Sequence, residues 1–319
     1  MKKLQTEKLF TKHSNVLLLS LLCTILWGSA YPCIKTGYQL FGLATNDVSG
    51  KLVFAGIRFF LAGLITLTIY MLQNKRFIFP ERTKLKGIFM VSITQTVLEY
   101  LFFYISMSHI TGVKGSILNA SSSFFVVILA HLFYKNDKIT LPKMMGCIIG
   151  FGGIIMINLN GMNTFDFHFN FMGDGMMLLS GLSFAVGSLL SKNISQKSDP
   201  MMVTGYQLGF GGFLLLLLGL ITGGTLKSVS IPGILLLTYM AFLSATAFTI
   251  WTILSKYNKI SKIAVYNFLT PVFGALLSAI FLGENLLTLN NLLALLLVSI
   301  GIGIVNMVKN TSSIRDTKS

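Results

Sequence analysis

The stretch 266–307, YNFLTPVFGALLSAIFLGENLLTLNNLLALLLVSIGIGIVNM, decides how the rest of the chain is interpreted. An earlier stretch beginning at Ile117, ILNASSSFFVVILAHLFYKNDKITLPKMMGCIIGFGGIIMI, aligns with this part of the chain without a gap. Three pairs of identical residues fall 148 positions apart (267 − 119): Asn119 and Asn267, Thr140 and Thr288, Gly153 and Gly301. Each copy is an apolar run, a polar break ending in threonine and a second apolar run closing on glycines. The pattern indicates a duplicated chain.

The composition is that of a membrane protein. Of the 319 residues, 53% are hydrophobic and only 11% are charged, with a mean hydropathy of +0.75. A soluble protein of this size would carry about 25% charged residues. Apolar runs of roughly 20 residues, enough to span about 30 Å of hydrocarbon, recur along the chain. The net charge of +15 lies in short loops and not on one basic face, which favours a lipid-bilayer partner and no nucleic acid.

The apolar runs predict an all-α membrane protein with ten transmembrane helices. Their expected bounds are 15–36, 49–72, 85–107, 112–134, 142–160, 171–194, 200–222, 231–255, 260–282 and 287–308. The first run is too long for a signal-peptide core and has no clear A-x-A exit, so it is read as a mature span. The three cysteines fall inside or at the ends of spans without metal-ligand spacing, which favours packing residues over a metal site.

Lysines and arginines predict the orientation. With the N-terminus in the cytoplasm, 20 of the 25 lysines and arginines fall in cytoplasmic segments. Lys35, Lys51, Lys114 and Lys227 fall outside, and Arg58 lies within a span. This bias has the direction of the positive-inside rule. The expected localisation is the plasma (inner) membrane, multi-pass, with both termini cytoplasmic.

The duplication extends to the other spans. CTILWGSAYPCIK in the first span corresponds to SGLSFAVGSLLSK in the sixth, with Lys35 on Lys192, and AGIRFFLAGL in the second corresponds to TGYQLGFGGF in the seventh. Each half, 1–160 and 161–319, holds five spans, an odd number, so the second copy must enter the membrane upside down. The prediction is therefore two inverted five-helix repeats, the architecture of secondary transporters with a substrate site near the bilayer midplane.

The motifs WGSAYPCIK, IRFFLAGL and LTPVFGALLSAIFLGENLLT, with a glycine-closed last span, resemble the EamA-type family of the drug/metabolite transporter superfamily. The likeness covers nearly the whole chain. It implies ten spans in two inverted repeats, a central cavity lined chiefly by spans 1, 3, 4, 6, 8 and 9, and transport of small metabolites. The first half departs from the family pattern, because Ser123 replaces the family's proline and Lys135-Asn136 replaces its Gly-Glu, with Asp137 next to it.

The expected function is a secondary transporter for a small metabolite, an amino acid or related compound, that exports its substrate by alternating access. A passive channel for small polar solutes is the alternative, while proton coupling and a homodimer stay open. No phosphate-cradling loop, HExxH or nucleotide-binding glycine fingerprint occurs, so the chain is expected to be no enzyme and to use no metal and no cofactor.

Glu99 is the only carboxylate well inside an apolar run, and an acid there costs roughly 2.5–3.5 kcal/mol on insertion scales. It is expected to couple protons or bind a substrate ammonium, against the alternative of a structural acid. Arg58 lies at nearly the same depth on the preceding antiparallel span. Either the two interact, directly or through water, or Arg58 snorkels outward.

The other expected site residues are polar groups at repeat-related positions and aromatic side chains on the spans that the resemblance places around the cavity. Asn119 and Asn267 are expected to face each other across it, or else only to bind helices together. The remaining candidates for substrate binding are Trp27, Tyr31, Tyr100, Phe103, Ser122, Phe248, Trp251, Tyr266 and Thr270. Pro271 is expected to act as a kink or hinge, and Glu284 as a helix cap or gate latch.

Overall fold

The computed structural model describes residues 7, 9–75, 79–135, 137–156, 168–267 and 269–306. Within these ranges the regular secondary structure is helical, which confirms the all-α prediction. In chain order the elements are α2 (His13–Leu40), α3 (Val48–Asn74), α4 (Arg82–Ser92), η1 (Ile93–Leu98), α5 (Glu99–Met107), α6 (Gly112–Asn119), α7 (Ser121–Phe133), α8 (Leu141–Met156), η2 (Phe171–Gly175), α9 (Met176–Gln196), α10 (Pro200–Ile221), α11 (Ile231–Tyr257), α12 (Ile260–Tyr266), α13 (Leu269–Leu282) and α14 (Leu289–Asn306).

Eight of the ten predicted spans correspond to helical rods that are long and apolar enough to cross a membrane. The rods are α2, α3, α4–η1–α5, α6–α7, η2–α9, α10, α11 and α12–α13. The predicted spans 142–160 and 287–308 correspond to α8 and α14, but residues 157–160 and 307–308 lie outside the described residues. The 16 described residues of α8 extend about 24 Å, and Leu289–Gly301 of α14 is a shorter apolar helix.

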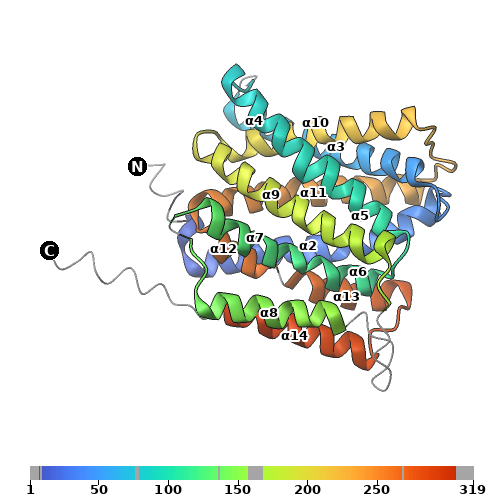
Figure 1. Ribbon diagram of the computed structural model, residues 1–319. Coiled ribbons are helices and arrows are strands. Elements are labelled where there is room, and N and C mark those ends of the chain that lie inside the picture. Colours follow the sequence, from blue (N-terminus) through green and yellow to red (C-terminus); the bar gives the residue numbers. More distant parts are fainter. Residues whose placement is uncertain are drawn as a thin grey trace.

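The helices form one bundle with a helix pair along each of two opposite edges (Figure 1). The pair α3–α10 lies along one edge and the pair α8–α14 along the other. Between them α2 packs on α11 and α13, while α9 packs on α5 and α7. Helices from the two halves of the sequence are therefore interleaved, and the centre of the bundle is built from both.

Glycines bring the two helices of each edge pair into close contact. A Cβ added at Gly63 of α3 would meet the backbone of Gly209 in α10, and one added at Gly301 of α14 would meet Gly150 of α8. Small residues let helix backbones approach closely, which is the main source of helix association in lipid. The GxxxG formed by Gly205 and Gly209 is thus used inside the chain, against α3.

Two of the rods are broken in their middle. The fourth rod breaks at Ala120, between α6 and α7, and the eighth at Asn267, between α12 and α13. At both breaks the backbone tightens to i→i+3 hydrogen bonds: Ser123 N donates to Ala120 O at 3.0 Å, and Thr270 N to Asn267 O at 2.9 Å. Pro271 lacks the amide hydrogen that a continuous helix would need at the second break. The first break forms without a proline, in the run of three serines that follows Ala120.

The third rod contains a π-helical turn, η1, directly before Glu99. Side chains of this turn are held by the second half of the chain: Gln95 Nε2 donates to Ser188 Oγ at 3.1 Å, and Thr96 Oγ1 to Gln207 Oε1 at 2.8 Å. Such turns inside α-helices are rare and occur frequently at functional sites. The turn sets the direction in which Glu99, the first residue of α5, leaves the rod.

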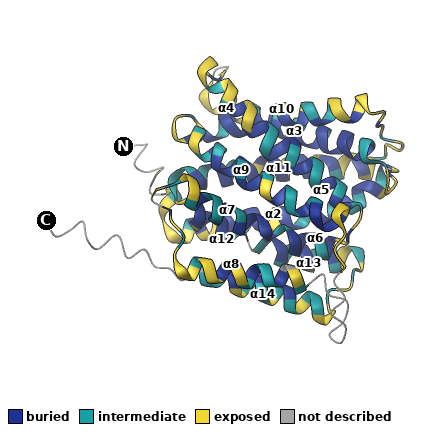
Figure 2. Cartoon of the chain, in the orientation of Figure 1, coloured by how far each residue is buried: buried dark blue, intermediate teal, exposed yellow. Residues whose placement is uncertain are grey.

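Apolar side chains cover much of the outer surface. Figure 2 shows the buried residues on the facing sides of the helices and the exposed ones on the outer faces and at the ends. Leu72, Ile221 and Ile280 are among the large apolar residues that are more than 70% exposed. Extensive exposed apolar surface marks contact with a partner or a membrane. Together with the spanning helices, it is consistent with lipid around the bundle.

Candidate functional site: a central cavity

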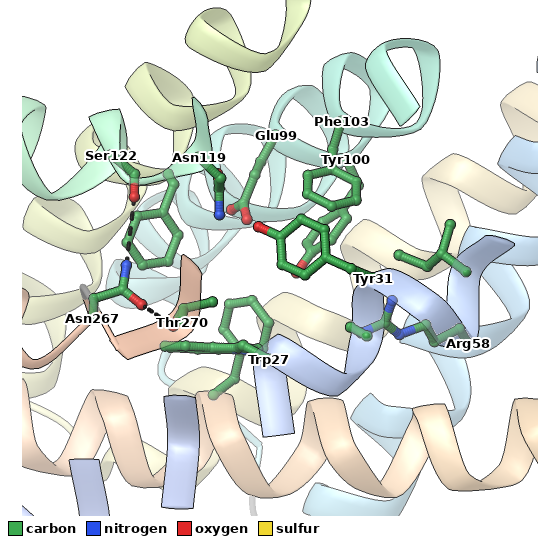
Figure 3. Close-up of a pocket in the computed structure, with 14 residues that line it drawn as sticks. Trp27, Tyr31, Arg58, Glu99, Tyr100, Phe103, Asn119, Ser122, Asn267 and Thr270 are labelled. Carbon is green, nitrogen blue, oxygen red and sulfur yellow. Dashed lines mark hydrogen bonds between the residues drawn. The ribbon is translucent and has the colours of Figure 1, made fainter. Parts of the chain in front are cut away.

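A cavity lies in the centre of the bundle (Figure 3). Its walls come from α2, α3, α5, α6, α7, α9, α11, the turn at Asn267 and α13, so both halves contribute. The lining residues are Trp27, Ala30, Tyr31, Ile34, Arg58, Glu99, Tyr100, Phe103, Asn119, Ser122, Phe184, Phe248, Asn267 and Thr270. Ten of the twelve substrate-binding candidates from the sequence therefore line one space.

The two broken rods place amide side chains on the cavity wall. Asn119 ends α6 and Asn267 lies in the turn after α12, so each stands where a helix stops. Asn267 Nδ2 donates to Ser122 Oγ at 3.4 Å, and Thr270 Oγ1 donates to Asn267 Oδ1 at 2.9 Å. Asn119 lies across from Asn267 (Figure 3). This arrangement offers a bound molecule amide donors and acceptors from both halves of the chain.

Glu99 reaches the cavity from the start of α5. The residue is buried, and its Oε2 atom has no hydrogen-bond partner. Figure 3 shows its carboxyl group beside Asn119, with the Tyr31 hydroxyl directed at both. The Tyr31 hydroxyl is likewise buried, and the Asn119 side chain lies within its reach. Buried polar atoms are nearly always hydrogen-bonded in proteins, so the free Glu99 oxygen is suited to a ligand or water in the cavity.

Arg58 lies on the opposite side of the cavity from the amides (Figure 3). Its Nε donates to Ser244 Oγ at 2.9 Å and its Nη1 to the Tyr104 hydroxyl at 3.4 Å, and the guanidinium stacks over the Phe59 ring at 4.7 Å. Only 1% of Arg58 is exposed, so it does not snorkel outward. Among the ion pairs of the described residues none joins Arg58 to Glu99. The direct form of the expected pair is therefore not formed.

Aromatic rings enclose the remaining wall. Trp27 packs edge-on against Phe184, Phe248 and Trp251, with ring centroids 6.1, 5.6 and 5.1 Å away. Tyr100 and Phe103 add two rings on the α5 side, 5.9 Å apart. Edge-on arrangements are the favourable ones for aromatic pairs, and they leave ring faces for a flat or apolar ligand group. The cavity thus combines one polar side with an aromatic enclosure.

Four candidates from the sequence do not line the cavity. Trp251 packs edge-on against the Trp27 ring, and its Nε1 atom is buried without a hydrogen-bond partner. Tyr266 is half-buried at the end of α12. The Pro271 carbonyl accepts from Ser116 Oγ at 3.3 Å, which ties α13 to α6. Glu284 lies beyond the cavity, where it accepts from backbone amides of α6.

Three lining residues were not singled out from the sequence: Ala30, Ile34 and Phe184. Phe184 follows Trp27 by 157 positions, the same offset that joins Lys35 to Lys192, so the repeat contained the signal. The described residues hold no group of three or more His, Cys, Asp or Glu side chains placed to bind a metal ion. Chemically, the site can hydrogen-bond a polar head, attract a cation through Glu99 and enclose an apolar body.

Comparison with known proteins gives the family. The sequence model of the EamA-like transporter family matches twice, at residues 14–159 and 171–307. "Uncharacterized transporter YvbV" of Bacillus subtilis (strain 168) is 28% identical over 309 residues, covering 94% of this chain and 93% of that protein. "Uncharacterized inner membrane transporter YedA" of Escherichia coli (strain K12) is 25% identical over 265 residues, covering 82% of this chain and 81% of that protein.

More distant proteins resemble the chain as well. A WAT1-related chloroplastic protein of Arabidopsis thaliana is 23% identical over 268 residues, which cover 81% of this chain and 62% of that protein. Among the solved structures that match, a crystal structure with a TM-score of 0.68 at 14% identity, over 91% of this chain and 96% of its own, shows a shared fold. Because the two family matches together span most of the sequence, this chain belongs to the EamA-like transporter family and is a multi-pass membrane transporter.

Proposed function

We propose that the chain is a secondary transporter that exports a small metabolite, an amino acid or related compound, across the plasma membrane. It works by alternating access between two inverted five-helix repeats, 1–160 and 161–319, with ten spans. The observation that carries this proposal is the cavity at the level of the two helix breaks. Discontinuous spans meeting at a central site are typical of secondary transporters, because their free backbone ends and end residues bind the cargo.

The pairing of helices supports the inverted repeat. If the halves are related by a twofold axis, α3 corresponds to α10 and α8 to α14, and each of these pairs is in contact. Contacts between helices that do not correspond to each other have a counterpart in the other half. The contact of α2 with α13 corresponds to that of α9 with α7, and the contact of α2 with α11 corresponds to that of α9 with α5. The two family matches divide the chain at the same place.

Burial of several lining side chains supports a transporter over a channel. Tyr31 is 2% exposed, Glu99 7% and Phe248 1%, so these side chains do not face open solvent in this conformation. A passive channel needs a continuous solvent-filled pore, whereas alternating access does not. Glu99 is assigned to proton coupling or to a substrate ammonium, since it is the one acid that lines the cavity.

The orientation follows from charge, with both ends in the cytoplasm. Single cysteines in the cysteine-free protein test it: Thr225→Cys should react with an impermeant thiol reagent in intact cells, and Lys197→Cys should react only after permeabilisation. Both positions are exposed. Labelling of Lys197→Cys from outside would contradict this orientation.

Transport itself is tested in two steps. Metabolites inside and outside cells that overexpress the chain are compared with those of cells lacking it, and the compound depleted inside and enriched outside is the candidate cargo. Purified protein in liposomes should then show saturable uptake and counterflow of that compound. Flux without saturation and without counterflow would indicate the passive channel instead.

A further inference from the structure

At one end of the bundle an acid and a lysine hold the turn that leads into α6. Glu284, in the loop between α13 and α14, accepts from Gly112 N at 2.9 Å and Val113 N at 2.8 Å. Lys35 of α2 donates through Nζ to the carbonyl of Ile110 at 2.7 Å. Residues 110–113 are therefore fastened by side chains from two other elements.

At the opposite end an acid and a lysine hold the turn that leads into α12 (Figure 1). Asp137, in the loop between α7 and α8, accepts from Ser261 Oγ at 2.6 Å, and its other oxygen accepts from Ser261 N at 3.3 Å. Lys192 of α9 donates through Nζ to the carbonyl of Asn258 at 2.5 Å. Lys143 also pairs with Asp137, at 2.8 Å.

These two arrangements correspond under the repeat. Ile110 and Asn258 are 148 positions apart, as are Val113 and Ser261, and the two lysines are the equivalent pair from the first and sixth spans. The acid is the exception. The residue equivalent to Glu284 is Asn136, and Asp137, one position later, makes the contact in its place.

We propose that the two arrangements are matched gate latches, and that Asp137 has replaced the acid missing at residue 136. The outer latch joins Glu284 to the start of α6, and the inner latch joins Asp137 to Ser261. Each latched segment, α6 or α12, begins at its latch and ends at a helix break on the cavity wall. Each can therefore swing about its break when its latch opens. This inference rests on the proposed alternating access.

The latches differ in their chemistry. Glu284 binds backbone amides, which truncation of a side chain in α6 does not remove, whereas Asp137 accepts from a side-chain hydroxyl as well as a backbone amide and is also paired with a lysine. Ser261→Ala should therefore weaken the inner latch, but Val113→Ala, at the equivalent position, should leave the outer latch closed. Both latches are closed in this structure.

The test uses two reporters in the cysteine-free protein. Ile34→Cys and Ser191→Cys occupy equivalent buried positions, each directly before a latch lysine. Adding Asp137→Asn should speed labelling of Ser191→Cys from the cytoplasmic side and slow labelling of Ile34→Cys from outside. Adding Glu284→Gln should do the reverse. The ratio of the two rates should change about 10-fold in each case, because a hydrogen bond to a charged group can shift a two-state equilibrium by that factor.

Asp199→Asn is the matched control. Asp199 also accepts from backbone amides, those of Met201 and Met202 at the start of α10, but it belongs to neither latch. It should leave the ratio unchanged. Ser261→Ala covers the case in which Asp137→Asn lowers the amount of folded protein, and it should shift the ratio in the same direction.

The outcomes separate the two proposals. If both latch variants leave the ratio unchanged, or change both rates alike, the latches are overturned while alternating access stands. If the reporters already react rapidly from both sides without any latch substitution, the alternating-access proposal fails, and the latch proposal fails with it.

Discussion

The α3–α10 edge and the two broken rods are built in opposite ways. At the edge, glycines bring two unbroken helices so close that an added Cβ would strike backbone. At the breaks, the helices stop at Asn119 and before Asn267, and the contacts between the two rods include side-chain hydrogen bonds, such as Asn267 to Ser122 at 3.4 Å. The backbone packing between α3 and α10 cannot adjust in small steps. A side chain at a helix break, in contrast, can readily exchange its hydrogen-bond partner for a ligand.

This contrast assigns different tasks to the two regions. Packed helix interfaces transmit strain and resist deformation, so the edge pairs are suited to hold the bundle while the segments beside the cavity move. Substitutions at the edge should therefore change the amount of folded protein. Substitutions at the breaks should change transport and leave abundance near normal.

The largest effect is expected from Gly63→Val. The new side chain would collide with the backbone of Gly209 and with the Gly205 carbonyl, 2.8 Å from an added Cβ. Overpacking typically costs about 1–3 kcal/mol, and backbone cannot move aside as a side chain can. Folded protein, measured as the monodisperse fraction after extraction in mild detergent, should fall about 10-fold or more.

Gly209→Ala is the control in the same interface. An added Cβ at Gly209 meets nothing within 4 Å, although Gly209 belongs to the GxxxG. It should extract normally. Equal damage from both variants would show that glycine content, and not the one-sided contact, governs this edge.

An effect of similar size is expected from Glu99→Ala, now on transport. The variant removes the acid that lines the cavity with an unpartnered Oε2 atom. A bond to a charged group contributes about 1.5–3 kcal/mol, so transport of the identified cargo should fall roughly 10- to 150-fold. Glu81→Gln, an exposed acid paired with Lys84, is the matched control. If both counterflow and transport driven by a pH gradient are unimpaired in Glu99→Ala, Glu99 is a structural acid.

Much of the cavity was predictable because the duplication brings like residues together. The gap-free alignment of Asn119 with Asn267 predicts two amides on one axis, and an acid inside an apolar run predicts a buried group such as Glu99. Both line the cavity. Neither inference needs side-chain geometry, which is why the sequence was sufficient.

The remaining features depend on packing that no local pattern records. Nothing in the run of three serines predicts a break as a proline does, yet α6 ends at Asn119. The position of Arg58 is set by Ser244 and Tyr104, which come from distant helices. Asp137 takes the place of the acid missing at residue 136. The sequence does not show that a carboxylate one position later reaches Ser261, because that contact depends on the path of the loop.

A smaller effect on transport is expected from Asn119→Ala and Asn267→Ala. A neutral hydrogen bond contributes about 1 kcal/mol, so each variant should weaken apparent affinity about 5-fold while membrane abundance stays near normal. Asn291→Ala is the control, since Asn291 makes its hydrogen bond at an exposed site in the α13–α14 region. If each variant lowers abundance and leaves affinity unchanged, the two amides only hold the breaks together.

The smallest effect concerns Asp137 and pH. It tests the loop between α7 and α8, which belongs neither to the α3–α10 edge nor to the two helix breaks. Burial raises the pKa of Asp137, but hydrogen bonds from Lys143 and Ser261 and the charge of Lys143 outweigh it, so the pKa lies below the ordinary 3.8. A lowered folded-state pKa means that the ionised loop stabilises the protein above about pH 4. This contribution is lost as the pH falls through the folded value.

The measurement compares the thermal midpoint of unfolding in detergent for the parent protein and Asp137→Asn. At pH 7 the parent should be more stable by about 2–4 °C, the shift that roughly 1 kcal/mol produces in a protein of this size class. The difference should shrink as the pH is lowered from 4 to 3, because the parent's carboxylate becomes protonated and then resembles the amide. A difference that stays constant from pH 7 to 3, or grows on acidification, would mean that the charge of Asp137 does not hold this loop.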